Sequence, residues 1–160
     1  MTEVSIRPFA PGDAEAFRAL NLAWLTAYFR VEPKDTATLS DPGGVILAPG
    51  GQIFVAELNM QAVGCVALLP MFGGYELAKM AVDPAAQGRG AGRKLLTAAI
   101  AWARDQGAAR LYLESNARLT PALRLYESVG FRHLPEERRP ISPYARADVF
   151  MEMLLDKEPI

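Results

Sequence analysis

The chain has 160 residues, 51% of them hydrophobic and 22% charged, and its formal net charge is -1. This length and composition predict one globular domain over residues 1–160 and argue against a nucleic-acid-binding protein that works by bulk electrostatics. A single cysteine and a single histidine, Cys65 and His133, exclude an internal disulfide and predict no metal site. No apolar segment is long enough to span a bilayer, and the N-terminus lacks the apolar core of a signal peptide. We therefore expect a cytoplasmic protein that does not associate with membranes.

In chain order, the hydrophobic pattern predicts a strand, a helix, a meander of three strands, and then helices that alternate with strands. Asp13 and Thr120 are expected as helix N-caps. A meander gives antiparallel strands and a helical crossover gives a parallel pair, so this order predicts a mixed sheet with helices on its faces. Strands are expected over residues 4–7, 52–58, 62–70, 75–82, 109–115, 131–134 and 147–155, and helices over 14–30, 36–39, 91–107 and 119–130.

The segment QGRGAGR places Gly88, Gly90 and Gly92 where a long helix is about to begin. Glycine is costly in a helix, so some contact is expected to need the bare backbone there. The first N–H groups of a helix have no intrahelical partner and attract anions, and Arg89 and Arg93 add positive charge. This pattern predicts a pyrophosphate site, although a turn that only serves packing is the alternative. Neither the Rossmann nor the Walker spacing is present.

Two motifs in this chain resemble those of the GNAT superfamily of acetyltransferases. Gln87-x-x-Gly90-x-Gly92 resembles the Q/R-x-x-G-x-G/A signature, and SNARLTPALRLYESVGF resembles the later N-x-x-A…L-Y-x-x-x-G-F region. YELAKMAV and ADVFMEMLL occupy the places of the central and closing strands, so the resemblance covers residues 52–155. It implies an α+β fold with a central mixed, mostly antiparallel sheet. That sheet is expected to splay at an acetyl-CoA cleft and to carry helices on both faces.

The same resemblance implies acetyl-CoA (coenzyme A) as the cofactor. Backbone groups of the central strand would hold the pantetheine arm like an added strand, and the glycine segment would hold the pyrophosphate. Asn116 would bond the arm or order the site, although asparagine is also common in turns. The expected cofactor-binding residues are Met80, Ala81, Val82, Gln87, Gly88, Arg89, Gly90, Ala91, Gly92, Arg93, Asn116 and Tyr126.

Two residues are expected to be catalytic. Tyr126 matches the family tyrosine that acts as general acid, and its alternative role is to pack the helix on the sheet. Glu76 has the position of a catalytic glutamate in one branch of the family, where it would accept the amine proton or hold a substrate ammonium. Its alternative is a solvent-facing strand residue. Strand alternation predicts that Glu76, Ala78, Met80 and Val82 share one face, with Lys79 pointing away as a solvated or salt-bridging residue.

The acceptor pocket is expected between the first helix with its following loop and the EERRPISPYAR loop. The candidate residues of the first wall are Trp24, Tyr28, Arg30, Phe72 and Tyr75, and those of the second wall are Tyr144 and Arg146. The alternative for the aromatic residues is the core, and for the charged loop it is a solvated surface.

The resemblance implies an enzyme that transfers an acetyl group from acetyl-CoA to a primary amine of a small molecule, by direct attack in a ternary complex. Two alternatives stay open: a protein or peptide N-acetyltransferase, and a non-catalytic GNAT-like module that senses acyl-CoA. The resemblance often implies a homodimer as well. The identity of the amine and the length of the acyl group are left open by the sequence.

Overall fold

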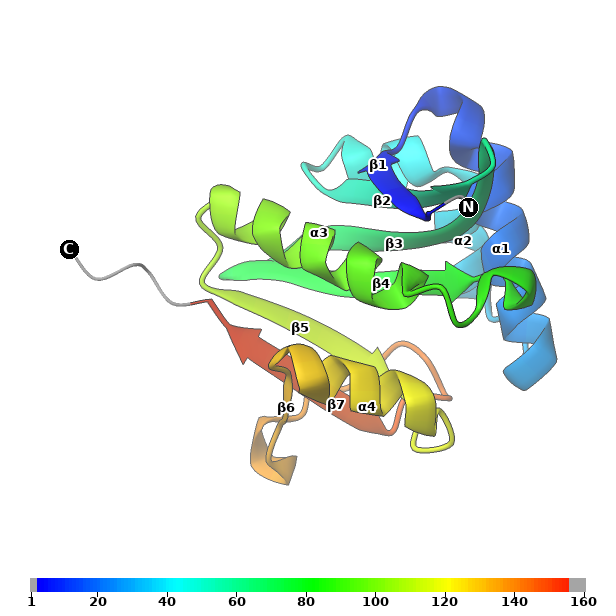
Figure 1. Cartoon of the computed structure of the whole chain (residues 1–160). Helices are drawn as coiled ribbons and strands as arrows, with labels where there is room; N and C mark the ends of the chain where they lie inside the picture. The colour runs from blue at the N-terminus through cyan, green and yellow to red at the C-terminus, as the bar shows by residue number, and fades with distance from the viewer. Residues whose placement is uncertain (1–2, 156–160) are drawn as a thin grey trace.

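The computed structural model describes residues 3–155. They form one seven-stranded sheet with the strand order β1-β2-β3-β4-β5-β7-β6 (Figure 1). All neighbouring strands are antiparallel except β4 and β5, which are parallel, so the expected mixed and mostly antiparallel sheet is confirmed. The strands are β1 (Ser5–Pro8), β2 (Gln52–Leu58), β3 (Gln61–Met71), β4 (Gly74–Val82), β5 (Arg110–Ser115), β6 (Arg132–His133) and β7 (Val149–Leu154).

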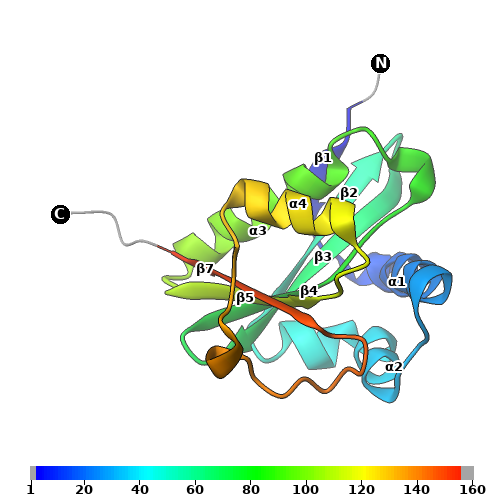
Figure 2. The ribbon, with the colours of Figure 1, turned by 90° about the horizontal axis from the view of Figure 1, so that it is seen from below.

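Helices cover both faces of the sheet, as expected (Figure 2). The α3/α4 face carries α3 (Ala91–Asp105) and α4 (Thr120–Val129), and the α1/α2 face carries α1 (Ala14–Tyr28) and α2 (Pro33–Ser40). None of the helices in residues 3–155 is both long and apolar enough to cross a bilayer. The remaining helical turns are Pro11–Asp13, Gly43–Leu47, Pro84–Ala86 and Glu136–Arg138.

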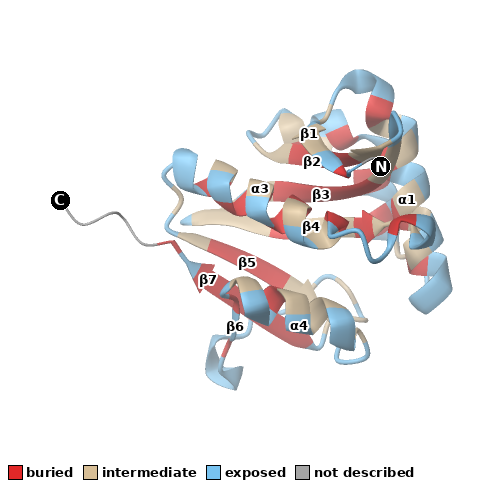
Figure 3. Ribbon diagram, in the orientation of Figure 1, coloured by how far each residue is buried: buried red, intermediate tan, exposed pale blue. Residues whose placement is uncertain are grey.

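The larger core lies between the sheet and α3, whose inner surface is buried while its outer surface is exposed (Figure 3). Leu95, Leu96 and Ala99 recur at helical spacing and are fully buried. Burying each leucine stabilises the fold by about 1.5–3 kcal/mol. A second core, around Phe17 and Ile53, lies between the sheet and α1. The two cores hold the two helical layers on opposite sides of one rigid sheet.

The sheet splits between β4 and β5. Their pairing covers only three positions and ends at Glu76 and Tyr112. Beyond these residues β4 continues to Val82 beside β3, while β5 continues to Ser115 beside β7. Figure 1 shows the two ribbons diverging toward the carboxyl ends of both strands. The expected splay is therefore confirmed, and Glu76 lies at its apex.

A β-bulge at Lys79 changes which side chains of β4 share a face. The register with β3 shifts there, and Lys79 has a φ of 54°. One extra residue inverts the alternation that follows it. Met80 and Val82 consequently pack in the α3/α4 core. Glu76, in contrast, is the register partner of Leu69 on β3, and Leu69 packs in the α1/α2 core. The prediction that Glu76, Met80 and Val82 share one face is wrong for this reason.

Some expected helix boundaries also differ. Thr120 is the first residue of α4 and Leu119 holds the N-cap position. Asp13 holds the N-cap position of α1 as expected, but its side chain makes no capping hydrogen bond and instead accepts hydrogen bonds from Arg7 and from the Ala10 N–H. An ion pair with Arg7 of β1 therefore takes the place of the side-chain cap.

Candidate active site

The glycine segment forms an exposed turn that leads into α3. Gly88 and Gly90 have φ values of 82° and 77°, in the left-handed region that side chains other than glycine rarely adopt. Gly92 has another reason to lack a side chain, since a Cβ there would lie 3.1 Å from Leu125 Cδ2 of α4. Two glycines thus shape the turn, and the third lets the two helices approach each other.

Free backbone donors gather at this turn. The first hydrogen bond of α3 runs from the Lys94 N–H to the Gly90 carbonyl, 3.0 Å. The N–H groups just before Lys94 therefore have no intrahelical acceptor. Arg89 is exposed, and Arg93 donates to Ser128 Oγ of α4 at 2.9 Å. Donors, the helix dipole and two guanidinium groups together fit a pyrophosphate. Every sequence-predicted residue from Gln87 to Arg93 lies here.

The free edge of β4 provides a second part of a cofactor site. Met80, Ala81 and Val82 lie beyond the last β4–β5 pair, so their strand has no β5 neighbour there. An extended chain can add to such an edge through backbone hydrogen bonds. The edge leads directly into the glycine turn, through Asp83 and the turn Pro84–Ala86. The residues of this chain therefore fit a long arm that ends in a pyrophosphate.

Glu76 lies at the apex of the split, on the α1/α2 face. Its carboxyl has a pKa raised to about 7, mainly because burial penalises the charged form and secondly because Glu114 lies nearby. Lys34 and Lys79 oppose this rise. A carboxyl that titrates near neutral pH can exchange a proton with an amine under physiological conditions.

Glu114 is a residue of this site that sequence analysis missed. Its Oε2 accepts a hydrogen bond from the Tyr112 hydroxyl at 2.8 Å, and its Oε1 accepts one from Ser142 Oγ at 2.5 Å. Tyr112 is the β5 partner of Glu76, and Glu114 follows two residues later on the same face. Strand alternation combined with the β4–β5 register would have found it, but the sequence does not reveal that register.

Tyr126 lies on the other side of the split, in the α3/α4 core. It is buried and packs edge-to-face against Phe131, with 6.1 Å between the ring centroids. Burial raises the pKa of its phenol to about 12, so it keeps its proton at neutral pH. The structure thus places Glu76 and Tyr126 on opposite faces of the split sheet.

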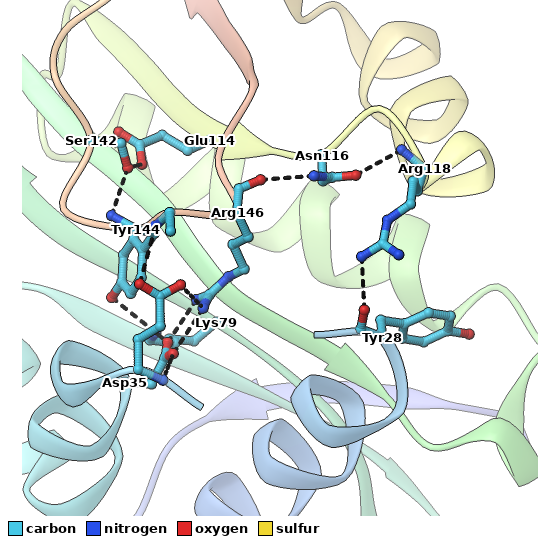
Figure 4. A network of polar contacts seen from close by, with 11 residues as sticks. Tyr28, Asp35, Lys79, Glu114, Asn116, Arg118, Ser142, Tyr144 and Arg146 are labelled. Carbon is cyan, nitrogen blue, oxygen red and sulfur yellow. Dashed lines mark hydrogen bonds and ion pairs between the residues drawn. The ribbon is translucent and has the colours of Figure 1, made fainter. Parts of the chain in front are cut away.

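A buried ion cluster around Asp35 joins α2, β4 and the 134–148 loop, which connects β6 with β7 (Figure 4). The Asp35 carboxylate is fully buried and accepts from Lys79 Nζ at 2.6 Å. It also accepts two hydrogen bonds from the Arg146 guanidinium, at 2.8 and 2.7 Å. Burial alone would raise the pKa of Asp35, but the hydrogen bonds from Arg146 and Lys79 hold it at about 2. We call this cluster the first tether.

Lys79 was expected to point away from the face of Glu76, and this prediction is wrong. The bulge turns its side chain onto the α1/α2 face, beside Asp35. Its ammonium also donates to the Tyr144 hydroxyl at 3.1 Å. The centroid of the Tyr144 ring lies 4.8 Å from Lys79 Nζ and 4.3 Å from the centre of the Arg146 guanidinium. Arg146 is thus held by Asp35 of α2, and Tyr144 by Lys79 of β4.

A second tether runs from the loop after β5 to the end of α1. Arg118 donates to the Tyr28 carbonyl at 2.9 Å, and its guanidinium lies 4.7 Å from the Phe29 ring centroid. Asn116 orders this loop, since its Nδ2 donates to the Arg146 carbonyl at 2.8 Å and its Oδ1 accepts the Arg118 N–H. Figure 4 shows both tethers on the same side of β4 and β5.

A family profile, that of the Acetyltransferase (GNAT) family, matches residues 15–131. The chain belongs to the GNAT family. It is 37% identical over 106 residues to the uncharacterized N-acetyltransferase YjgM of Escherichia coli K12. This alignment covers 61% of this chain and 64% of YjgM. It is 33% identical over 143 residues to a mycothiol acetyltransferase of Arthrobacter sp. FB24, covering 80% of this chain and 42% of that one.

A shorter match, 45% over 65 residues, is to the N-alpha-acetyltransferase RimI of Mycobacterium tuberculosis, covering 41% of this chain and 39% of RimI. Each of these alignments spans less than two thirds of the curated relative. Among solved structures, a GNAT acetyltransferase of Staphylococcus aureus Mu50 superposes with a TM-score of 0.87 at 22% identity. This match covers 96% of the present chain and 99% of the other one, and it supports the fold.

The aromatic residues predicted for the acceptor pocket of this GNAT chain do not all gather. Trp24 and Tyr28 lie on α1 beside the second tether, with their ring centroids 5.8 Å apart. Tyr75 points to the α3/α4 face, where it packs on Trp102 of α3 with 4.8 Å between centroids. Phe72 is 97% exposed in the β3–β4 turn, at the closed end of the β4–β5 pair. The structure therefore separates Tyr75 and Phe72 from Glu76.

Arg30 follows α1 and is exposed, and no hydrogen bond or ion pair of its side chain is found within residues 3–155. In the same part of the chain, no group of three or more His, Cys, Asp or Glu side chains is arranged to hold a metal ion. The candidate site of this GNAT chain thus combines the glycine turn, the split edge of β4, Glu76 with Glu114 on one face, and Tyr126 on the other.

Proposed function

We propose that this GNAT chain is an acetyl-CoA-dependent N-acetyltransferase that modifies a primary amine of a small molecule in a ternary complex. The observation that carries the proposal is the position of Glu76 at the apex of the split, on a face that two tethers bridge. The split and the glycine turn supply the cofactor side of this arrangement. The tethered face supplies the acceptor side.

Acetyl-CoA is the cofactor of GNAT acetyltransferases, and the residues of this chain fit it. The backbone of Met80, Ala81 and Val82 would bind its pantetheine arm, and the N–H groups from Gly88 to Arg93 would bind its pyrophosphate, since the Gln87 N–H already donates to the Pro84 carbonyl. Asn116 acts indirectly, by ordering the loops above the site. Once bound, acetyl-CoA supplies an activated acetyl group to an amine held beside it, and this proximity accounts for much of the rate.

Two residues would move the protons. Glu76 takes the proton that the amine loses, because its carboxyl titrates near neutral pH on the acceptor face. Tyr126 holds a proton on the opposite face, where a leaving thiolate needs one. The new bond joins the amine nitrogen to the acetyl carbon, and the bond from that carbon to sulfur breaks. One proton moves from the amine to Glu76 and one moves from Tyr126 to the leaving thiolate; solvent then takes the proton from Glu76 and reprotonates Tyr126.

The tethers support a small acceptor over a polypeptide. The first tether joins the 134–148 loop to the start of α2, and the second joins the loop after β5 to the end of α1. An extended peptide rises about 3.3 Å per residue and needs a groove that is open along its length. Two bridges between the walls of that groove oppose such binding. An amine of a few carbons needs only the opening between them.

Thiol release from acetyl-CoA tests this function with two sets of probes. The small probes are spermidine, phenethylamine, glucosamine and glycinamide, and the large ones are hexapeptides with a free N-terminus or an internal lysine. We expect turnover of at least one small probe and none of the hexapeptides, with loss of turnover in Glu76→Gln. Turnover of hexapeptides alone would make the chain a protein N-acetyltransferase. A thermal shift with acetyl-CoA, and not with ATP or NAD, but no turnover of any probe would favour a sensing module.

A further inference from the structure

Glu114 lies on the acceptor face and takes no direct part in the proton transfers proposed for Glu76 and Tyr126. Its carboxylate is held by one hydroxyl from its own strand, Tyr112, and by one from the 134–148 loop, Ser142. We propose that Glu114 is a positioning residue that acts on the acceptor proton through Glu76. This inference rests on the proposed function, because it gives a partner to the base used there.

The backbone brings the two carboxylates together. Glu76 and Tyr112 are partners across the parallel pair β4–β5, and partners in a parallel pair project to the same face. Glu114 shares that face with Tyr112 and is bonded to its hydroxyl at 2.8 Å. Both hydrogen bonds to Glu114 come from hydroxyl donors, so they orient its negative charge without neutralising it.

Other charged groups near Glu76 compensate Glu114 only in part. The ammonium of Lys79 is already paired with Asp35 at 2.6 Å, and Lys34 is exposed, so solvent screens its charge. Among the acidic side chains of residues 3–155, Glu114 is the one that raises the pKa of Glu76, and burial of Glu76 strengthens this effect. The titratable and charged groups that act on Glu76, or on which it acts, come from β4, β5, α2 and the 134–148 loop; they are Lys79, Tyr112, Glu114, Lys34 and Tyr144.

The consequence for the reaction is a base matched to neutral pH. A carboxylate with an ordinary pKa of about 4.3 is a poor acceptor for an amine proton, whereas proton transfer is most efficient when the base titrates near the working pH. Glu114 would add to the effect of burial in bringing about this match, while touching neither the acceptor nor the cofactor. Ser142 links the same carboxylate to the 134–148 loop, so the loop that borders the acceptor also orients the group that acts on the base.

The pH dependence of kcat/KM tests this role, with saturating acetyl-CoA and the small amine that is turned over fastest. Glu114→Gln keeps an acceptor for the Tyr112 hydroxyl but removes the charge. We expect the acid limb of its profile to move to lower pH, so that at pH 6 it retains a larger share of its plateau rate than the wild-type chain does. Glu137→Gln is the matched control, because it removes one negative charge from an exposed position of the 134–148 loop. Its acid limb is expected to coincide with that of the wild type.

A titration that needs no activity separates this inference from the proposed function. Carboxyl carbon resonances of labelled glutamates report the midpoint of Glu76 directly, and Glu76→Gln identifies the signal by its loss. We expect the Glu76 midpoint to fall in Glu114→Gln and to stay unchanged in Glu137→Gln. An unchanged midpoint in Glu114→Gln, or an equal fall in both variants, would overturn the role of Glu114. Failure of the wild-type chain to turn over any amine, with the midpoint shift still present, would overturn the proposed function alone.

Discussion

Glu76 of β4 and Tyr112 of β5 are register partners, and they are the last pair before the two strands separate. The split therefore begins at the carboxyl that is proposed to accept the acceptor's proton. Tyr126 lies across the sheet from it, in the α3/α4 core. A group that passes through the split meets a carboxyl on one face and a phenol on the other. In the proposed reaction, the two proton transfers would therefore take place from opposite faces of the sheet.

Replacing Tyr126 by Phe tests the phenol. The ring still fills its place against Phe131, and only the hydroxyl is lost. We expect kcat to fall by about 10²–10⁴-fold, the usual contribution of general acid–base catalysis. The affinity for acetyl-CoA, measured by calorimetry, should change little. Tyr75→Phe is the matched control, because that residue packs on Trp102 and should retain wild-type turnover. Full turnover in Tyr126→Phe would reduce this tyrosine to a packing role.

The raised pKa of Glu76 predicts how the stability of the chain depends on pH, independently of catalysis. Its carboxyl pKa is raised from 4.5 to about 7 in the folded chain, so the folded state binds the proton more tightly than the unfolded state does. Between these two pH values the folded state binds more protons, and the free energy of unfolding falls as pH rises. The loss at pH 8 is at most about 3 kcal/mol. We expect Glu76→Gln to raise the Tm relative to the wild type at pH 8 and not at pH 4.5. An equal difference in Tm between variant and wild type at both pH values would contradict a raised pKa of the buried Glu76 carboxyl.

The contribution of Asp35 to stability should change with pH in the opposite direction to that of Glu76. Asp35→Asn leaves the cations of Lys79 and Arg146 without their buried anion, and breaking a buried pair in this manner costs about 3–5 kcal/mol. Because the pKa of Asp35 is lowered to about 2, its contribution is present above the unfolded value of 3.8 and is lost as pH falls toward 2. Denaturant unfolding at pH 7 and at pH 2.5 measures the difference.

Asp105→Asn is the control for this experiment, since Asp105 is exposed at the end of α3. It should unfold like the wild-type chain at both pH values. If Asp35→Asn were as stable as Asp105→Asn at pH 7, the first tether would contribute nothing to the fold. A tether that contributes no stability would not hold the 134–148 loop against α2, and the acceptor face would be open to larger substrates.

The sequence was sufficient for features that depend on local patterns. The glycine turn, the amphipathic face of α3 and the order of the strands all follow from spacing within a few residues. The bulge at Lys79 could not be read in this way, because one extra residue leaves the apolar pattern of β4 almost unchanged while it inverts the faces. Asp35 and Arg146 are 111 residues apart, and nothing local pairs them. Glu114 was missed for the same reason, since its role depends on the register of two strands.

The glycine turn gives a last test, in which backbone strain and ligand contact can be separated. Gly90 and Gly107 both have positive φ, 77° and 79°, and in both places an added Cβ would meet open space. Asparagine tolerates this backbone conformation better than most residues do. Gly90→Asn and Gly107→Asn should therefore lose similar, small amounts of stability in denaturant unfolding. Only Gly90→Asn introduces a side chain beside the free N–H groups at the N-terminus of α3.

We expect Gly90→Asn to weaken acetyl-CoA binding by about tenfold or more, which corresponds to roughly 1.4 kcal/mol, while Gly107→Asn binds like the wild type. Calorimetric titration with acetyl-CoA measures both variants. The loss should be smaller for a dephosphorylated pantetheine thioester, because that ligand lacks the pyrophosphate that the turn is proposed to bind. Equal affinities for Gly90→Asn and Gly107→Asn would mean that the turn serves packing alone, and the cofactor would then have to be held by the edge of β4 without it.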